Sequence, residues 1–202
     1  MTLYSMIMKT FKRLEIASFV IAACLALMGV YGVSFEGRGV ITGVWLSTLC
    51  FAYFAGGILW FGRQPFGKYV IGLIYGIFLG WAASVCVVGI LFKSLLYEGW
   101  QPLLLLGTGV VSLAMVFAAI FAFAAKAEYR AYWRFVLLRT VLLVVLGIAV
   151  YLPTKEQVWE WRYADYPPLL EALKAYEDNP TEENQELLIE EQIRYDSIGH
   201  YQ

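Results

Sequence analysis

Long apolar runs separated by short polar turns are the main pattern along this chain. The run from Tyr69 to Phe92 carries no charged residue and has a small residue at every fourth position. At about 1.5 Å per residue, a helix of this length exceeds the roughly 30 Å hydrocarbon core of a bilayer, so we expect it to span a membrane. The same pattern predicts five spans, at residues 16–35, 40–61, 69–92, 103–125 and 135–152.

Small residues at four-residue spacing lie on one stripe of a helix. Such a stripe leaves a groove into which a neighbouring helix can settle closely. We interpret the third span as the packing centre of the bundle and the stripe of the second span as a partner for it. The two predicted helix-packing stripes consist of Gly72, Gly76, Gly80 and Ser84 in the third span and of Thr48, Ala52 and Gly56 in the second.

Composition supports an all-α integral membrane protein with a separate polar tail. Hydrophobic residues make up 60% of the 202 residues and charged residues only 15%, against about 25% in soluble domains. Residues 1–153 hold 11 basic and 4 acidic side chains, whereas residues 154–202 hold 4 basic and 12 acidic ones. We therefore predict a five-helix transmembrane bundle at 16–153 and an acidic extracytoplasmic helical tail at 154–202.

The distribution of lysine and arginine predicts the orientation. With five spans, nine basic residues near the membrane fall on the side of the N-terminus and four on the other side. Because cytoplasmic loops carry the excess of Lys and Arg, the N-terminus is expected in the cytoplasm and the C-terminus in the periplasm of a bacterial inner membrane. Arg139 lies one turn inside the short fifth span. A re-entrant segment there would instead leave the tail in the cytoplasm.

Residues 1–15 form a basic segment that we expect to hold the first span at the cytoplasmic surface. An interfacial amphipathic helix is the alternative for this segment. Residues 21–24 resemble the cleavage box of bacterial lipoproteins. The apolar sequence that continues from Leu25 to Phe35 argues against cleavage and lipidation at this site, because mature polar sequence normally follows a cleavage point.

The tail contains the start and stop signals of two short helices. Pro167 and Pro168 suit a helix start, Asn179 and Pro180 interrupt it, and Thr181 can cap the next helix. A hairpin of about 35 residues is too small to bury a core unaided. We therefore expect its apolar face to dock on a partner, through Leu169, Leu173, Tyr176, Leu188, Ile189 and Ile193.

The residues that catalysis and cofactor binding require are absent from the apolar spans. The first four spans contain no Asp, Glu, Lys, Arg or His, which disfavours a proton or ion pathway. The only histidine is His200, so haem bound between spans is excluded, and Ser47, Ser84 and Ser112 have no base within a helix turn. His200 with nearby acids could hold a divalent cation, but solvated charge at a chain end is the better interpretation. We expect no catalytic residue, no cofactor and no metal.

A basic and aromatic segment follows the fourth span. Its positive charges alternate with Tyr129, Tyr132 and Trp133, a combination suited to anionic lipid headgroups, although topology alone also explains it. The predicted headgroup residues are Lys126, Arg130, Arg134 and Arg139.

These observations lead to three ranked hypotheses of function. The first is a non-catalytic accessory subunit of a larger energy-transducing, secretion or transport complex, with integral membrane proteins and lipids as partners and no nucleic acid. The second is a carrier or channel for a neutral or apolar solute, or a lipid- or quinone-binding protein. The third is an enzyme. The path that the second hypothesis requires would be lined by Ser47, Thr48, Ser84, Thr108 and Ser112.

Overall fold

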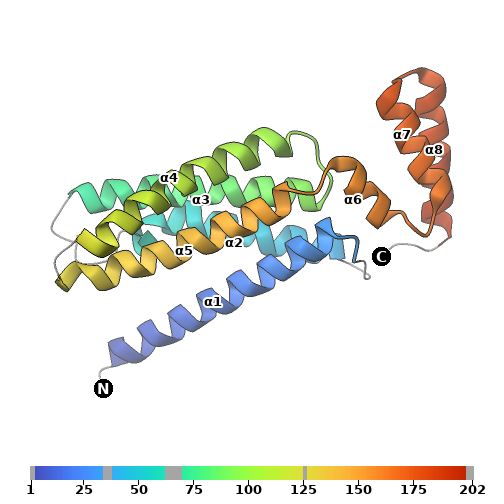
Figure 1. The fold of residues 1–202 in the computed structure, drawn as a ribbon. Coiled ribbons are helices and arrows are strands. Elements are labelled where there is room, and N and C mark those ends of the chain that lie inside the picture. The colour runs from blue at the N-terminus through green and yellow to red at the C-terminus, as the bar shows by residue number, and fades with distance from the viewer. Residues whose placement is uncertain (1–2, 34–37, 62–69, 125–126, 199–202) are drawn as a thin grey trace.

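The computed structural model describes residues 3–33, 38–61, 70–124 and 127–198. Within these residues the chain forms eight helices and no strand. Four long helices lie side by side, a fifth diverges from them toward its N-terminal end, and three short helices follow (Figure 1). The long helices are α1 (Leu3–Val30), α2 (Arg38–Phe61), α3 (Val70–Ser94), α4 (Trp100–Ala124) and α5 (Ala127–Tyr151), and the short ones are α6 (Lys155–Arg162), α7 (Pro167–Asp178) and α8 (Glu182–Ser197).

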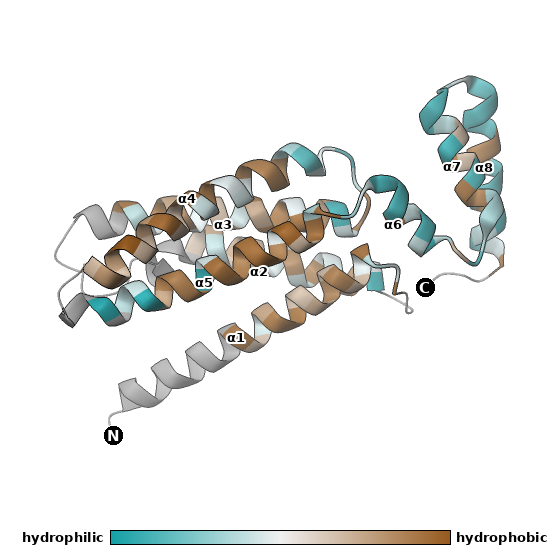
Figure 2. Cartoon of the chain, in the orientation of Figure 1, coloured by the Kyte–Doolittle hydropathy of each residue, from teal (hydrophilic) through white to brown (hydrophobic). Residues whose placement is uncertain are grey.

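The long helices carry the apolar surface that a bilayer requires. Hydrophobic residues dominate their described parts, whereas α6 to α8 are largely hydrophilic (Figure 2). In the part of the chain described, α2, α3, α4 and α5 each contain a stretch long and apolar enough to cross a membrane. In α1 the corresponding stretch, Ile16–Val30, is shorter than the roughly 20 residues of a typical span. The predicted all-α membrane fold is confirmed at this level, and the fifth crossing stays a prediction.

Helix α3 is the packing centre of the bundle, as its sequence predicted. It contacts each of the other four long helices. Ala83, Cys86 and Ile90 of α3 are fully inaccessible, while α4 keeps most of its surface on the outside. Helix α1 contacts the bundle through one edge, at Ala22, Ala26 and Val30.

The helices differ from the predicted spans at their ends. Helix α3 continues through Lys93, α4 begins at Trp100 and α5 begins at Ala127, so charged residues expected in connections are helical. Helix α1 ends at Val30, five residues earlier than the predicted first span. Hydropathy marks the hydrocarbon-compatible part of a helix, whereas backbone hydrogen bonds continue until a cap or a left-handed residue stops them.

The caps predicted for the tail are confirmed. Thr181 Oγ1 accepts a hydrogen bond from the Asn184 amide at the start of α8, and Pro167 is the first residue of α7. Helix α6 has a complete capping box, in which Thr154 and Gln157 each bond the backbone of the other. Helices α6 and α8 therefore start where a threonine provides a partner for a free amide, whereas α7 has no side-chain cap and starts at two prolines, which have no amide hydrogen to satisfy.

Candidate functional site

The predicted packing stripes are only partly covered by the bundle. Gly76, Gly80 and Ser84 of α3 are buried, and the Ser84 hydroxyl donates to the Trp81 carbonyl at 2.8 Å. In α2, Thr48 is exposed and bonds the Val44 carbonyl of its own helix, while Ala52 is half-buried. The surroundings of Gly56 and Gly72 lie outside the described part of the structure. That the two stripes are helix-packing surfaces stays a prediction.

Close packing of α3 on α4 depends on two other glycines. A Cβ at Gly89 would lie 2.6 Å from the Leu104 amide nitrogen, and one at Gly107 would collide with the Cys86 backbone. Each glycine thus receives the backbone of the other helix, which is how small residues let membrane helices approach. Neither glycine belongs to the predicted packing stripes, because Gly107 lies in the fourth span and Gly89 lies one residue off the four-residue spacing of the third.

Arg162, the last residue of α6, joins the C-terminal ends of α1 and α3. Its Nη2 donates to the Gly29 carbonyl at 2.7 Å and to the Ser94 carbonyl at 2.8 Å. Both carbonyls lie in the last turn of their helices, where they have no intrahelical partner and where the helix dipole favours a cation. Burial lowers the pKa of Arg162 to about 10. The side chain therefore stays charged at neutral pH and caps two helices at once.

The neighbouring residues fix α6 against the end of α1. The rings of Tyr31 and Trp161 stack with centroids 5.1 Å apart. Gly32 has a left-handed φ of +76°, and a Cβ there would lie 2.5 Å from the Trp161 carbonyl oxygen. Only glycine satisfies both conditions.

Lys93 joins the ends of α3, α4 and α5 in a similar way. The residue is 1% exposed, and its Nζ donates to the Tyr151 carbonyl at 2.9 Å and to the Pro153 carbonyl at 2.5 Å. The ammonium also lies 3.9 Å from the centroid of the Trp100 ring, a cation–π contact. We call Lys93, Arg162 and the four carbonyls that they bind the basic clasp. Sequence reasoning placed Lys93 in a connection and assigned Arg162 no contact, so the clasp was missed.

Two ion pairs hold the first two helices of the tail together. Lys155 pairs with Glu177 at 2.6 Å and Lys174 pairs with Glu160 at 2.7 Å, which links α6 to α7. These pairs are partly exposed, and such pairs contribute little each. They set the direction of α7 more than its stability.

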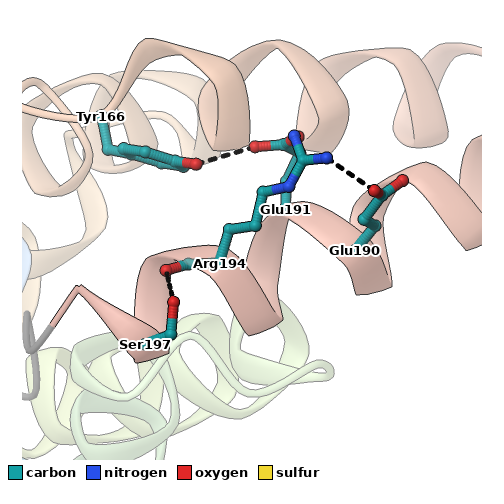
Figure 3. Close-up of polar contacts among 5 residues, drawn as sticks. All are labelled: Tyr166, Glu190, Glu191, Arg194 and Ser197. Carbon is teal, nitrogen blue, oxygen red and sulfur yellow. Dashed lines mark hydrogen bonds and ion pairs between the residues drawn. The ribbon is translucent and has the colours of Figure 1, made fainter.

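Glu191 of α8, which is only 6% exposed, joins this helix to Tyr166, the residue that precedes α7 (Figure 3). Its carboxylate accepts a hydrogen bond from the Tyr166 hydroxyl at 2.9 Å and pairs with Arg194 at 2.7 Å. The bond to the carboxylate raises the pKa of Tyr166 above its usual value, because it stabilises the neutral phenol. Arg194 also pairs with Glu190 at 2.7 Å.

The six residues predicted to dock on a partner fall into two groups. Leu169 is fully buried, and Leu173, Tyr176 and Leu188 are half-buried. Ile189 and Ile193 of α8 are instead 52% and 63% exposed. We call the α8 surface around these two isoleucines the α8 outer face. By helical spacing it also carries the acidic residues Glu182, Glu186 and Asp196.

The predicted headgroup residues do not share one surface. Arg130 and Arg134 are exposed and lie one turn apart on α5. Arg139 is half-buried, with its guanidinium carbon 3.9 Å from the centroid of the Phe135 ring. Lys126 lies outside the described residues.

The polar side chains of the spans are dispersed. Ser47 and Thr48 are exposed on α2, Ser84 is buried on α3, and the Thr108 hydroxyl lies 3.6 Å from the Cys86 sulfur. In the part of the chain that the structure describes, no three His, Cys, Asp or Glu side chains come close enough to hold a metal ion.

Fold and packing define the class: this chain is a helical membrane protein with a short polar helical tail. No known protein family, no curated protein and no solved structure matched it when the chain was compared with each. Its function therefore has to be inferred from its own residues.

Proposed function

We propose that this protein is a non-catalytic accessory subunit of a larger complex in a bacterial inner membrane. Five helices cross the membrane, the N-terminus is cytoplasmic, and the acidic tail docks on the periplasmic part of a partner. The partner supplies the chemistry. The observation that carries this proposal is the α8 outer face, where two large apolar side chains remain exposed on a tail that is fixed to the bundle.

The fixed position of the tail supports docking. The basic clasp anchors α6, ion pairs join α6 to α7, and the buried Glu191 joins α7 to α8. A surface held in one orientation loses less conformational freedom on binding than a flexible one. The acidic residues around Ile189 and Ile193 fit a partner with an apolar pocket bordered by lysine or arginine.

The length of α1 supports the fifth crossing. Its apolar stretch from Ile16 is short, but the helix begins at Leu3 and is 28 residues long. A helix of this length measures about 42 Å and can cross the bilayer at a tilt.

Purification from native membranes in a mild detergent tests the proposal. The full chain is compared with a chain that ends at Tyr166 and with the Ile189→Ser/Ile193→Ser double variant, and co-purifying proteins are quantified by mass spectrometry. We expect a stoichiometric membrane protein partner with the full chain and its loss with both variants.

Leu187→Ser is the matched control, because Leu187 lies on another side of α8 and is 43% exposed. This variant should keep the partner. A full-length protein that purifies alone and monodisperse would rule out the subunit role. Retention of the partner by the double isoleucine variant would rule out docking through the α8 outer face.

A further inference from the structure

A shallow apolar groove lies between α3 and α4 on the outer surface of the bundle. It has a volume of about 420 Å³, and its lining includes Tyr75 and Phe78 of α3 and Ala114 and Phe117 of α4. Phe78 and Phe117 are 65% and 48% exposed, whereas Tyr75 and Ala114 are half-buried. The groove lies within the apolar stretches of both helices, at a depth where hydrocarbon surrounds the protein.

The chemistry of the lining selects an apolar occupant. Among the lining residues that the structure describes, the one hydroxyl belongs to Tyr75 and already donates to the Ala114 carbonyl at 3.2 Å. These residues offer no free donor to a ligand with polar atoms, and burying such atoms unpaired is costly. The groove therefore fits a hydrocarbon chain better than a quinone ring or a polar solute.

The shape of the groove separates a hydrocarbon chain from a partner helix. A helix with its side chains is about 10 Å wide or more. The exposed rings of Phe78 and Phe117 would keep the axis of such a helix away from the small Ala114. Membrane helices pack closely along small residues, and the described lining contains a single alanine.

An aromatic cluster extends from the groove to Trp133 of α5. The Tyr75 ring meets the Trp133 ring edge-on at 5.4 Å. Phe121, one turn beyond Phe117, stacks on the same tryptophan with centroids 4.7 Å apart. Arg130 lies three residues before Trp133 and Arg134 directly follows it, and both arginines are exposed.

We propose that the groove and these two arginines form a binding site for one anionic phospholipid. An acyl chain lies in the groove against Ala114, and the phosphate pairs with Arg130 and Arg134 at the membrane surface. Aromatic rings such as Trp133 are typical of that surface, where apolar and wet environments meet. Anionic headgroups are attracted by arginines that lie near the membrane. Arg139 takes no part, because it covers the Phe135 ring.

Native mass spectrometry of the purified full chain tests the site, with phosphatidylglycerol and phosphatidylcholine of identical acyl chains added in competition. We expect one phosphatidylglycerol to stay bound, with a preference of about tenfold or more over phosphatidylcholine. Arg130→Gln/Arg134→Gln should abolish the preference, and Arg130→Lys/Arg134→Lys should keep most of it. Ala114→Trp should fill the groove and reduce the binding of both lipids.

Two further variants make the result decisive. Ala55→Trp places the same large ring on an exposed position of α2 and should leave lipid binding unchanged. Phe78→Ala removes an exposed ring at the rim of the groove and should weaken retention of the lipid. This variant keeps the test available if Ala114→Trp does not fold. Equal retention of the two lipids by the unchanged protein, or retention unaffected in both groove variants, would overturn the proposal. Capture of a protein helix by a photo-crosslinker at Phe78 in place of lipid would do the same.

Discussion

Two glycines of α4, separated by one residue, have opposite surroundings. A Cβ at Gly107 would collide with the Cys86 backbone of α3, whereas a Cβ at Gly109 would meet nothing within 4 Å. Placing the same residue at both positions therefore separates the effect of helix packing on stability from the effect of helix propensity.

We predict that Gly107→Leu destabilises the bundle by about 1–3 kcal/mol or more, because α3 and α4 must move apart. Gly109→Leu should stay within about 0.5 kcal/mol of the unchanged protein, as for other surface substitutions. Unfolding in mixed micelles with increasing denaturing detergent measures both. Equal stability of the two variants would show that α3 and α4 do not meet at Gly107.

Single residues also show which contacts could be predicted from the sequence and which could not. The stripe containing Gly76 and Gly80 was visible because four-residue spacing is a property of one helix. The meeting of Gly89 with Leu104 was not, because it depends on where two helices cross. Lys93 and Arg162 contributed to the predicted orientation only through their charge. Their contacts could not be predicted, because backbone carbonyls give no signal in the sequence.

At the scale of elements, the basic clasp determines where α6 lies. Local signals predicted the starts of α7 and α8, because proline and threonine act within one turn of their own position. The direction of the tail relative to the bundle could not be predicted, since Arg162 and its acceptor at Gly29 are 133 residues apart.

We predict that Arg162→Met releases α6 from the bundle. The Gly29 and Ser94 carbonyls lose a charged donor, and each such hydrogen bond contributes about 1.5–3 kcal/mol when partly buried. Hydrogen exchange of the amides of α6 should become faster while that of α3 changes little. Lys174→Met, which removes one exposed ion pair, should leave exchange in α6 nearly unchanged. Unchanged protection of α6 in Arg162→Met would contradict the anchoring role.

At the scale of the whole molecule, the all-α membrane fold followed from hydropathy and length. The predicted orientation in the bilayer rests on the distribution of lysine and arginine along the sequence, and labelling from one side of the membrane tests it.

We predict that Glu186→Cys, in a background where Cys24, Cys50 and Cys86 are alanine, reacts with a membrane-impermeant maleimide in intact spheroplasts. Arg134→Cys and a tag at the N-terminus should become accessible only after permeabilisation, because five crossings place both in the cytoplasm. Reaction of Glu186→Cys and Arg134→Cys from the same side would show that α5 does not cross. A tag accessible from outside, with Arg134→Cys protected, would show the same for α1.

The clasp also has a consequence for how the protein is made. The carbonyl of Gly29 leaves the ribosome 133 residues before Arg162, which caps it. At typical rates of synthesis that interval is on the order of ten seconds. During this time α1 can gain its contacts with α2, α3 and α5 only as each of these helices is synthesised, and the Gly29 carbonyl has no donor from α6. The last turn of α1 is therefore completed only when the chain has been synthesised past Arg162.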